Sequence, residues 1–291
     1  MAWDAVGHML VDQIAWNQLQ PDTREKVTKL VVALDDTYNE HRPYNFITAG
    51  AWLDDARSAP NYPYSKWHYI DVPFTFAGAP FFEPQPPHAL SAMSDCVAAL
   101  KTLKSQALSP PVATAMLMHL VGDIHQPLHC VDWNNDRGGN AYLIYGIPFS
   151  DLSKKSVANL HAFWDRAFRF GVSSDGKIVE LYQAPKIAER PDSADRGLIH
   201  DEAMKIMAQF PKESLPQLLS AKEPRDWAVE SYVAACLFAY PARPHPDNTE
   251  VVTLNADYVQ RAHDIARSRI ALGGYRLAEM LEGLFGKQAA H

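Results

Sequence analysis

The segment that most constrains this chain is residues 118–129, MHLVGDIHQPLH, which places three histidines and one aspartate in an otherwise apolar run. Side chains four apart on a helix lie on one face, about 5–6 Å from each other, so His119 and Asp123 can bind one metal ion together. Pro127 ends the helix. His129 follows that break and can therefore point elsewhere, so one segment can supply two metal centres.

Two interpretations of this segment are open. In a buried helix, the imidazoles can bond to backbone carbonyls, and for an isolated histidine that is the simpler explanation. Four such groups together favour a metal, because neutral imidazole with carboxylate is what zinc binds when thiolates are absent. The cysteines Cys96, Cys130 and Cys236 lack CxxC spacing, which argues against a thiolate zinc site and leaves at most one disulfide.

The composition is that of one globular domain over residues 1–291, with 47% hydrophobic and 21% charged residues. The net charge is −7 and no run of five Lys or Arg occurs, so an electrostatic grip on a duplex is not expected. Three zinc ions would change that charge to −1 and supply the missing attraction. No apolar run approaches the ~20 residues of a membrane span, and neither a membrane nor a protein partner is expected.

Apolar residues recur at helical spacing along most of the chain, which predicts an all-α, mostly helical fold. The expected helices cover residues 7–20, 21–34, 44–57, 90–105, 110–126, 157–170, 195–209, 225–239 and 256–284. One short strand is expected at 141–145. Residues 73–87 hold five prolines and are expected to form an irregular loop.

A second His/Asp pair, His161 and Asp165, repeats the spacing of the first. The chain then offers eight nitrogen and oxygen ligands: His8, Asp54, His68, His119, Asp123, His129, His161 and Asp165. Taken singly, several have a structural alternative: a core histidine at His8, a surface acid at Asp54, an aromatic-cluster member at His68, an ion pair of Asp165 with Arg166 or Arg169. Their conjunction with the histidine segment predicts more than one zinc site.

Seven motifs occur in a fixed order: WDAVGH at 3–8, WLD at 52–54, WHYID at 67–71, the histidine segment, DRGGN at 136–140, NLHAFWD at 159–165 and WAVES at 227–231. Their order and spacing resemble those of the trinuclear-zinc nuclease family that includes mung bean nuclease. The run GDIHQPLH is specific by itself. The resemblance covers most of the chain and implies one mostly helical domain, structurally related to zinc phospholipase C, with three Zn²⁺ as cofactors.

Matched position by position, the resemblance implies three zinc sites. The first would be formed by Asp54, His68, His119 and Asp123. Asp123 would bridge to the second, completed by His8 and by the amino and carbonyl groups of Trp3, and the third would consist of His129, His161 and Asp165. Family members begin at the tryptophan, whereas Met1 and Ala2 here would turn its amine into an amide. The second site therefore requires their removal.

The resemblance also implies the substrate residues. Arg57 is similar to the arginine that contacts the scissile phosphate, and with Asp54 and Asp123 it forms the expected catalytic set. Tyr69 and Asp71 are similar to residues that stack on and hydrogen-bond a base, and Asn140 is expected beside them. The family usually has phenylalanine where this chain has Tyr69.

The implied activity is hydrolysis of single-stranded DNA and RNA to 5′-nucleotides, with 3′-nucleotidase activity on 3′-nucleotides. Zinc-activated water would attack phosphorus while Arg57 stabilises the growing charge. Stacking on Tyr69 requires an unpaired base, because a duplex hides its faces. The expected location is secreted or periplasmic, although the chain contains no signal peptide.

Two rival functions are open. The first is zinc phospholipase C, in which we expect glutamate at the position of Asp165. The second is a non-catalytic zinc-binding protein, which would need neither Arg57 nor Tyr69. Of the histidines outside the ligand set, His125 is expected to pack or to support its neighbours, and the others are expected to be structural: His41, His88, His200, His245, His263 and His291.

Overall fold

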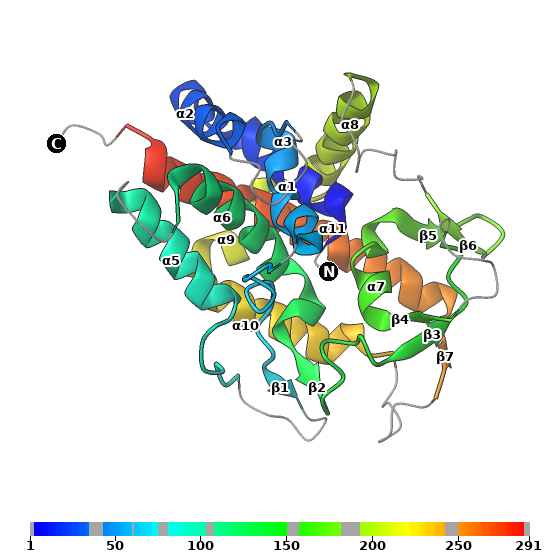
Figure 1. Ribbon diagram of the computed structural model, residues 1–291. Helices are drawn as coiled ribbons and strands as arrows, with labels where there is room; N and C mark the ends of the chain where they lie inside the picture. The colour runs from blue at the N-terminus through cyan, green and yellow to red at the C-terminus, as the bar shows by residue number, and fades with distance from the viewer. Residues whose placement is uncertain are drawn as a thin grey trace.

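The computed structural model describes residues 3–34, 43–59, 61–74, 81–102, 108–149, 157–181, 193–241 and 250–287. Within these ranges the chain forms one mostly helical domain, which confirms the expected fold class (Figure 1). The α-helices are α1 (Ala5–Gln18), α2 (Pro21–Val32), α3 (Phe46–Ala49), α4 (Trp52–Asp55), α5 (Ala89–Thr102), α6 (Pro110–His125), α7 (Leu160–Trp164), α8 (Ser193–Gln209), α9 (Gln217–Ser220), α10 (Pro224–Ala234) and α11 (Ala256–Phe285).

Helix α6 is the centre of the domain. Its residues from Ala113 to His125 are all buried, because the helix is apolar on every side and has no face suited to water. Pro110 and Pro111 occupy its first turn, where a missing N–H costs no helical hydrogen bond. Helices α1, α2, α5, α10 and α11 all pack against it. A side chain that projects from α6 therefore reaches the interior of the protein.

Helix α11 is long and crosses the domain beneath α1 and α6 (Figure 1). Asn255 caps its start by accepting a hydrogen bond from the Tyr258 amide at 2.9 Å. Gly274 lies where α11 meets α1. A Cβ atom added there would be 2.5 Å from the Cβ of Ile14 and 3.0 Å from the carbonyl oxygen of Val11. The absence of a side chain at Gly274 thus permits the close approach of the two helices.

The strands are short and form three small sheets: β1 (Pro73–Phe74) with β2 (Asp132–Trp133), β4 (Ala158–Asn159) and β7 (Val252–Thr253) on either side of β3 (Leu143–Tyr145), and β5 (Phe170–Val172) with β6 (Ile178–Glu180). The first pair is parallel, and Pro73 lies opposite Asp132. Just before it, the Ile70 amide donates to the His129 carbonyl at 2.8 Å. These bonds hold the segment around residue 70 against the turn that follows α6. The expected strand at 141–145 corresponds to β3.

Two expected helices are wrong as single elements. Residues 44–57 divide into α3, α4 and the 3₁₀ turn Ala56–Ser58, because Asn45 makes a capping box with Thr48 and α3 ends at Gly50. Residues 157–170 divide into β4, α7 and the 3₁₀ turn Ala167–Arg169, because the Asn159 side chain accepts from the Ala162 amide at 2.7 Å and starts a new helix there.

The remaining expected helices agree with the structure to within a few residues at each end. The irregular loop expected at 73–87 begins instead with the short strand β1, and residues 75–80 of it lie outside the described residues. Further 3₁₀ turns cover Pro127–Cys130 and Lys212–Ser214, and a π-helical turn, Ala235–Ala239, extends α10. Residues 103–105, expected at the end of a helix, lie outside the described residues.

The cysteines Cys96, Cys130 and Cys236 are free thiols. In the described part of the chain, the helices are too short or too polar to cross a membrane.

The contact at Gly274 generates a stability prediction. Gly274→Ala should lower the free energy of unfolding by about 1–3 kcal/mol, because the new methyl group meets the Ile14 side chain and the α1 backbone, and neither can move easily. Gly283→Ala, in the same helix, is the matched control. No atom lies within 4 Å of its added Cβ, so it should stabilise by about 0.5–1 kcal/mol. Urea unfolding of both variants measures this, and equal midpoints would contradict it.

Candidate metal centre and substrate cleft

Asp123 is the central side chain of the site. It projects from the last turns of α6, is fully buried, and is surrounded by four imidazoles. Its Oδ2 atom lies 3.0 Å from His119 Nε2 and 3.2 Å from His68 Nδ1. Its Oδ1 atom lies 3.5 Å from His8 Nε2 and 3.8 Å from His129 Nδ1. One carboxylate therefore joins ligands from α1, from the segment before β1, from α6 and from the turn after α6.

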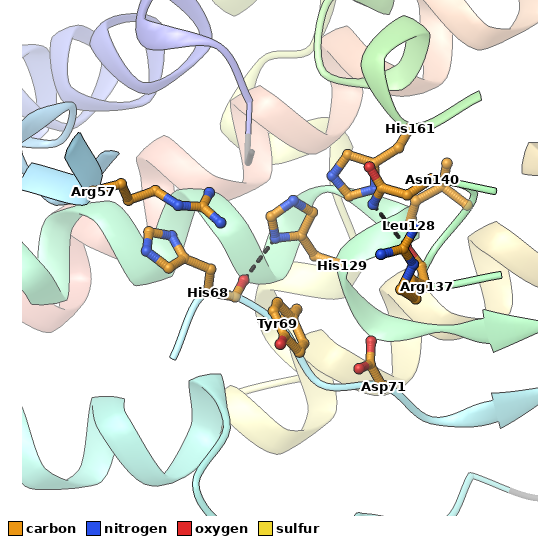
Figure 2. Close-up of a pocket in the computed structure, with 9 residues that line it drawn as sticks. All are labelled: Arg57, His68, Tyr69, Asp71, Leu128, His129, Arg137, Asn140 and His161. Carbon is orange, nitrogen blue, oxygen red and sulfur yellow. Dashed lines mark hydrogen bonds between the residues drawn. The ribbon is translucent and has the colours of Figure 1, made fainter. Parts of the chain in front are cut away.

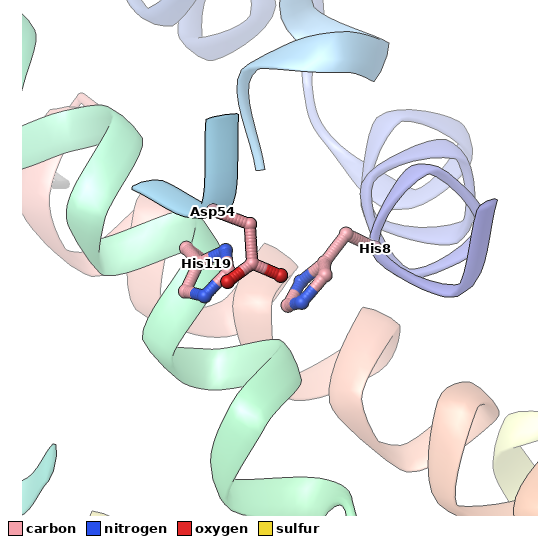
Figure 3. Close-up of side chains that lie close together, drawn as sticks. All are labelled: His8, Asp54 and His119. Atoms are coloured by element: carbon pink, nitrogen blue, oxygen red, sulfur yellow. The ribbon is translucent and has the colours of Figure 1, made fainter. Parts of the chain in front are cut away.

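The expected ligands gather into three groups whose donor atoms lie within 4.8 Å of one another: His8, Asp54 and His119; His68, His119 and Asp123; His129, His161 and Asp165. Figure 3 shows the first group, in which three helices each direct one side chain to a common point. Asp54 Oδ1 is also 3.7 Å from His68 Nδ1, which links the first two groups. The grouping places all eight expected side chains at one site. Which of them share a metal ion stays a prediction.

Backbone carbonyls orient three of the imidazoles. The Nδ1 atom of each faces a carbonyl oxygen: His119 that of Gly50 at 2.6 Å, His129 that of His68 at 2.6 Å, and His161 that of Gly138 at 2.7 Å. A histidine that donates from Nδ1 in this way keeps its Nε2 lone pair for a metal. The described residues thus present three preoriented Nε2 donors.

His68 is oriented the opposite way. Its Nε2 atom lies 2.7 Å from the Tyr62 hydroxyl, and that hydroxyl donates to the Leu53 carbonyl at 3.1 Å. Because the phenol proton is used on Leu53, Tyr62 accepts the Nε2–H of His68. The Nδ1 lone pair of His68 then faces His119 Nε2 at 2.9 Å, beside Asp123. Tyr62 could not be identified from the sequence, because no local pattern ties a tyrosine six residues upstream to this histidine.

The charges of the cluster favour a bound cation. Both oxygens of Asp123 and both ring nitrogens of His8 are buried without a hydrogen bond of good geometry among the described residues. Buried polar groups are normally bonded, so this clustering of unsatisfied polar atoms fits a metal site.

The carboxylates also change the protonation of the histidines. Against the effect of burial, Asp123 and Asp54 raise the pKa of His119 to about 9, whereas burial lowers the pKa of His68 to about 4. The position between the carboxylates thus attracts positive charge, whether a proton or a metal.

The third group has its own support. The rings of His129 and His161 stack with centroids 5.0 Å apart, and Asp165 Oδ1 lies 3.6 Å from His161 Nε2. Gln126 donates to that same oxygen at 2.8 Å. Burial raises the pKa of Asp165 well above its usual range, so its charged form needs a neighbouring cation.

Both arginines considered as ion-pair partners of Asp165 have other contacts: the guanidinium of Arg166 lies over the Phe149 ring, 5.5 Å from its centroid. Arg169 makes ion pairs with Asp4 and with Glu180. The alternative explanation of Asp165 as the ion-pair partner of that arginine is therefore not needed to account for its position beside His161.

Trp3 lies beside the site. It is fully buried, its ring meets that of Phe168 edge to face at 6.1 Å, and the next amide, of Asp4, donates to the Asp165 carbonyl at 3.1 Å. Asp4 also caps α1 by accepting from the Gly7 amide at 3.1 Å. These bonds tie the chain before His8 to the third group. Met1 and Ala2 lie outside the described residues, and the role of Trp3 as a ligand stays a prediction.

A cleft of about 320 Å³ opens onto the ligands. Its lining includes all four expected substrate residues, Arg57, Tyr69, Asp71 and Asn140, together with His68, His129 and His161. In Figure 2, Arg57 lies beside His68 at one end, Tyr69 lies near the middle, and Asn140 lies toward the other end. Arg57 Nη1 is held by Asp54 Oδ1 at 3.2 Å. We refer to this cavity as the substrate cleft.

Arg137 also lines the substrate cleft, although only Asn140 of the DRGGN motif was expected there. Its backbone has φ 56°, a left-handed conformation that is costly for a residue with a side chain. Its amide donates to Asp132 Oδ1 at 2.9 Å and its carbonyl accepts from Asn140 Nδ2 at 2.8 Å. The turn thus fixes Arg137 and Asn140 together.

Asp71 lies in the same cleft and has a shifted pKa. Burial and the charges of Asp132 and Asp136 raise the pKa of Asp71 to about 6.

Known proteins resemble this chain over nearly its whole length. The family described as S1/P1 Nuclease matches residues 3–286. Three proteins of Arabidopsis thaliana are similar to it. Endonuclease 4 is 25% identical (100% of this chain and 92% of the plant protein covered), Endonuclease 1 is 26% identical (99% and 89%), and Endonuclease 2 is 26% identical (98% and 91%).

The position of Asp123 generates a prediction about metal content. Asp123→Asn should lose metal from the first two groups together, because it removes the buried carboxylate that faces His8, His68 and His119 and leaves Asp54 as the remaining negative charge of these groups. Asp165→Asn is the matched control, since it changes only the third group. Elemental analysis of the purified variants, with circular dichroism to confirm folding, measures the difference. A full metal content in Asp123→Asn would show that its carboxylate does not bridge the groups.

Proposed function

This chain belongs to the S1/P1 nuclease family, and we propose that it is an endonuclease that uses three zinc ions to hydrolyse single-stranded DNA and RNA to 5′-nucleotides, with 3′-nucleotidase activity as well. The observation that supports this most strongly is that all three His/Asp groups belong to one site, whose cleft is also lined by an arginine and by an aromatic ring. A cation site for storage would require neither. The secreted or periplasmic location stays a prediction.

Zinc is proposed because the donor set is imidazole and carboxylate, with the imidazoles preoriented by carbonyls and by Tyr62. Magnesium and calcium prefer oxygen ligands, and a site with five histidines is poorly suited to them. When bound, zinc would acidify a water molecule and offset the negative charge of a phosphodiester. The protein must then hold the phosphate and orient the nucleotide.

Arg57 is proposed to hold the scissile phosphate. Its guanidinium reaches the substrate cleft beside His68 while Nη1 bonds to Asp54, so its position is fixed before substrate binds (Figure 2). Its remaining N–H groups can donate to phosphoryl oxygens, and these bonds strengthen as negative charge grows in the transition state. Asp54 thus has two roles, as a metal ligand and as a positioning residue for Arg57.

Tyr69, Asp71 and Asn140 are proposed to bind a base. Tyr69 is half-buried and lines the middle of the substrate cleft, so it offers a ring face for stacking. Asp71 and Asn140 supply a carboxyl and an amide for the hydrogen-bonding edge of the base. A paired base exposes neither its faces nor that edge, which supports a preference for single strands with weak dependence on sequence.

The zinc phospholipase C alternative has less support. Asp165, not glutamate, stands beside His129 and His161, and the similar proteins are named endonucleases. Turnover of single-stranded DNA compared with turnover of phosphatidylcholine separates the two activities.

The proposed function predicts a zinc content and an activity that depends on it. The purified protein should hold close to three zinc ions, lose hydrolysis of single-stranded DNA when a chelator removes them, and regain it when zinc is returned. Elemental analysis and a fluorescent oligonucleotide assay measure both quantities. A zinc content of one or none, or cleavage of phosphatidylcholine with no cleavage of DNA, would refute the proposal.

A further prediction distinguishes the kinetic roles of Arg57 and Tyr69. Arg57→Ala should lower kcat on single-stranded DNA by at least tenfold with a smaller effect on KM, since its bonds strengthen in the transition state. Tyr69→Ala should mainly raise KM by about fivefold to a hundredfold, because stacking is worth about 1–3 kcal/mol in ground and transition states alike. Tyr145→Ala, at an exposed tyrosine outside the substrate cleft, is the control. Identical kinetic profiles for Arg57→Ala and Tyr69→Ala would show that the roles are misassigned.

A further inference from the structure

A second cavity, of about 610 Å³, is bordered by the residues just before His68 and Tyr69. One wall is formed by the rings of Tyr64 and Trp67, and the other by a face of α5 that carries Asp95, Ala98, Ala99 and Thr102. We call it the aromatic groove. Trp67 lines the aromatic groove, whereas its neighbours His68 and Tyr69 line the substrate cleft. A single stretch of chain, residues 67–69, therefore borders both cavities.

The aromatic wall is tied to the metal centre. The rings of Tyr64 and Trp67 have centroids 4.9 Å apart, and Tyr64 meets Tyr62 edge to face at 5.5 Å. Tyr62 in turn holds His68 by the hydrogen bond described above. The two half-buried rings of the groove are thus held in place by the same tyrosine that orients a metal ligand. Such rings lose little freedom when a flat ligand stacks on them.

The opposite wall is small and polar. Asp95, Ala98, Ala99 and Thr102 follow the spacing of one helix face, and the two alanines leave the groove open above the core. Asp95 and Thr102 are exposed at its rim, where they offer a carboxylate acceptor and a hydroxyl. The groove thus combines a stacking surface with hydrogen-bonding groups at its edge.

We propose that the aromatic groove binds the base of a second nucleotide of the strand whose neighbouring nucleotide occupies the substrate cleft. This inference rests on the proposed function and extends it from one nucleotide to two or more. The aromatic wall stacks on the base, and Asp95 accepts from an exocyclic amino group, which cytosine, adenine and guanine carry and thymine lacks.

The charges near the groove favour a nucleotide over another aromatic-binding ligand. Tyrosine and tryptophan rings beside a carboxylate also suit a quaternary ammonium group, such as that of choline. Lys66, between the two groove aromatics in the sequence, and Lys101, next to Thr102, are both exposed. Asp95 is the one charged residue among the described residues that line the groove, and the two lysines, which flank its lining residues in the sequence, suit the phosphate that joins successive nucleotides.

The test compares a substrate that reaches the groove with one that does not. For each variant, kcat/KM is measured on a single-stranded DNA of 12 nucleotides and on a 3′-mononucleotide. The value for DNA is then divided by the value for the mononucleotide. Tyr64→Ala should lower this ratio by about tenfold, consistent with the roughly 1–3 kcal/mol of one stacked base. The matched control, Tyr145→Ala, should leave it within twofold, because this exposed tyrosine lines neither cavity. An unchanged ratio in Tyr64→Ala, with both substrates slowed equally, would show that Tyr64 acts only through Tyr62 and His68.

A variant at Asp95 tests whether the groove distinguishes one base from another. Asp95→Ala should lower kcat/KM on oligo-dC several-fold and leave oligo-dT within twofold, since only cytosine carries the amino group. Asp175→Ala, at an exposed aspartate that lines neither cavity, is the control. Equal losses on the two homopolymers would overturn the assignment of Asp95 to a base.

A binding measurement separates failure of this inference from failure of the proposed function. Calorimetric titration of the zinc-loaded protein with deoxycytidine should show heat that Tyr64→Ala diminishes, and choline should show none. Choline binding that Tyr64→Ala abolishes would overturn the inference in favour of a quaternary-ammonium site. If the protein neither holds zinc nor cleaves DNA, the proposed function fails, and the titration with deoxycytidine still decides whether the groove binds a base.

Discussion

The structure depends on one buried carboxylate, Asp123, that faces four imidazoles in the centre of the domain. Removing a charge from water is costly unless opposite charge and hydrogen bonds surround it, and the described residues leave both of its oxygens without a hydrogen bond of good geometry. A metal would satisfy them. Asp123 reaches this position because α6, which carries it, is buried on all sides from Ala113 to His125.

Close packing around α6 extends this requirement to the backbone. A Cβ atom at Gly122 would lie 2.6 Å from Nδ1 of His8, so α1 can bring that ring to Asp123 only because residue 122 has no side chain. A second glycine, Gly50, has a similar role. Its amide donates to the buried Asp12 carboxylate at 2.8 Å, and its carbonyl oxygen lies 2.6 Å from His119 Nδ1 and orients that ring. A side chain at position 50 would collide with that same carboxylate. The His/Asp cluster is thus held in place by peptide groups as well as by side chains.

Behind the ligands, a buried polar network holds the end of α6. Arg269 donates from Nε to the His125 carbonyl at 3.1 Å, and Arg276 Nη1 lies 2.9 Å from His125 Nε2. Glu230 pairs with both arginines, and Ser231 donates to the Ile124 carbonyl at 2.5 Å. His125 therefore supports its neighbours rather than joining a metal group, as the sequence indicated. The WAVES motif acquires a role here, because two of its residues fix the turn that leads to His129.

The sequence by itself determined the helices with continuous apolar periodicity and the two His/Asp pairs, because both patterns depend on residues within one or two turns of helix. It failed at 44–57 and 157–170, where side-chain caps at Asn45 and Asn159 override periodicity. Its His/Asp patterns and its motif resemblance indicated the eight side chains that the structure gathers into three groups able to hold a metal. Only the tertiary structure decided that Tyr62 selects the nitrogen that His68 presents, and that one segment borders both the cleft and the groove. Such contacts join residues from separate elements, and their geometry exists only once the helices have packed around α6.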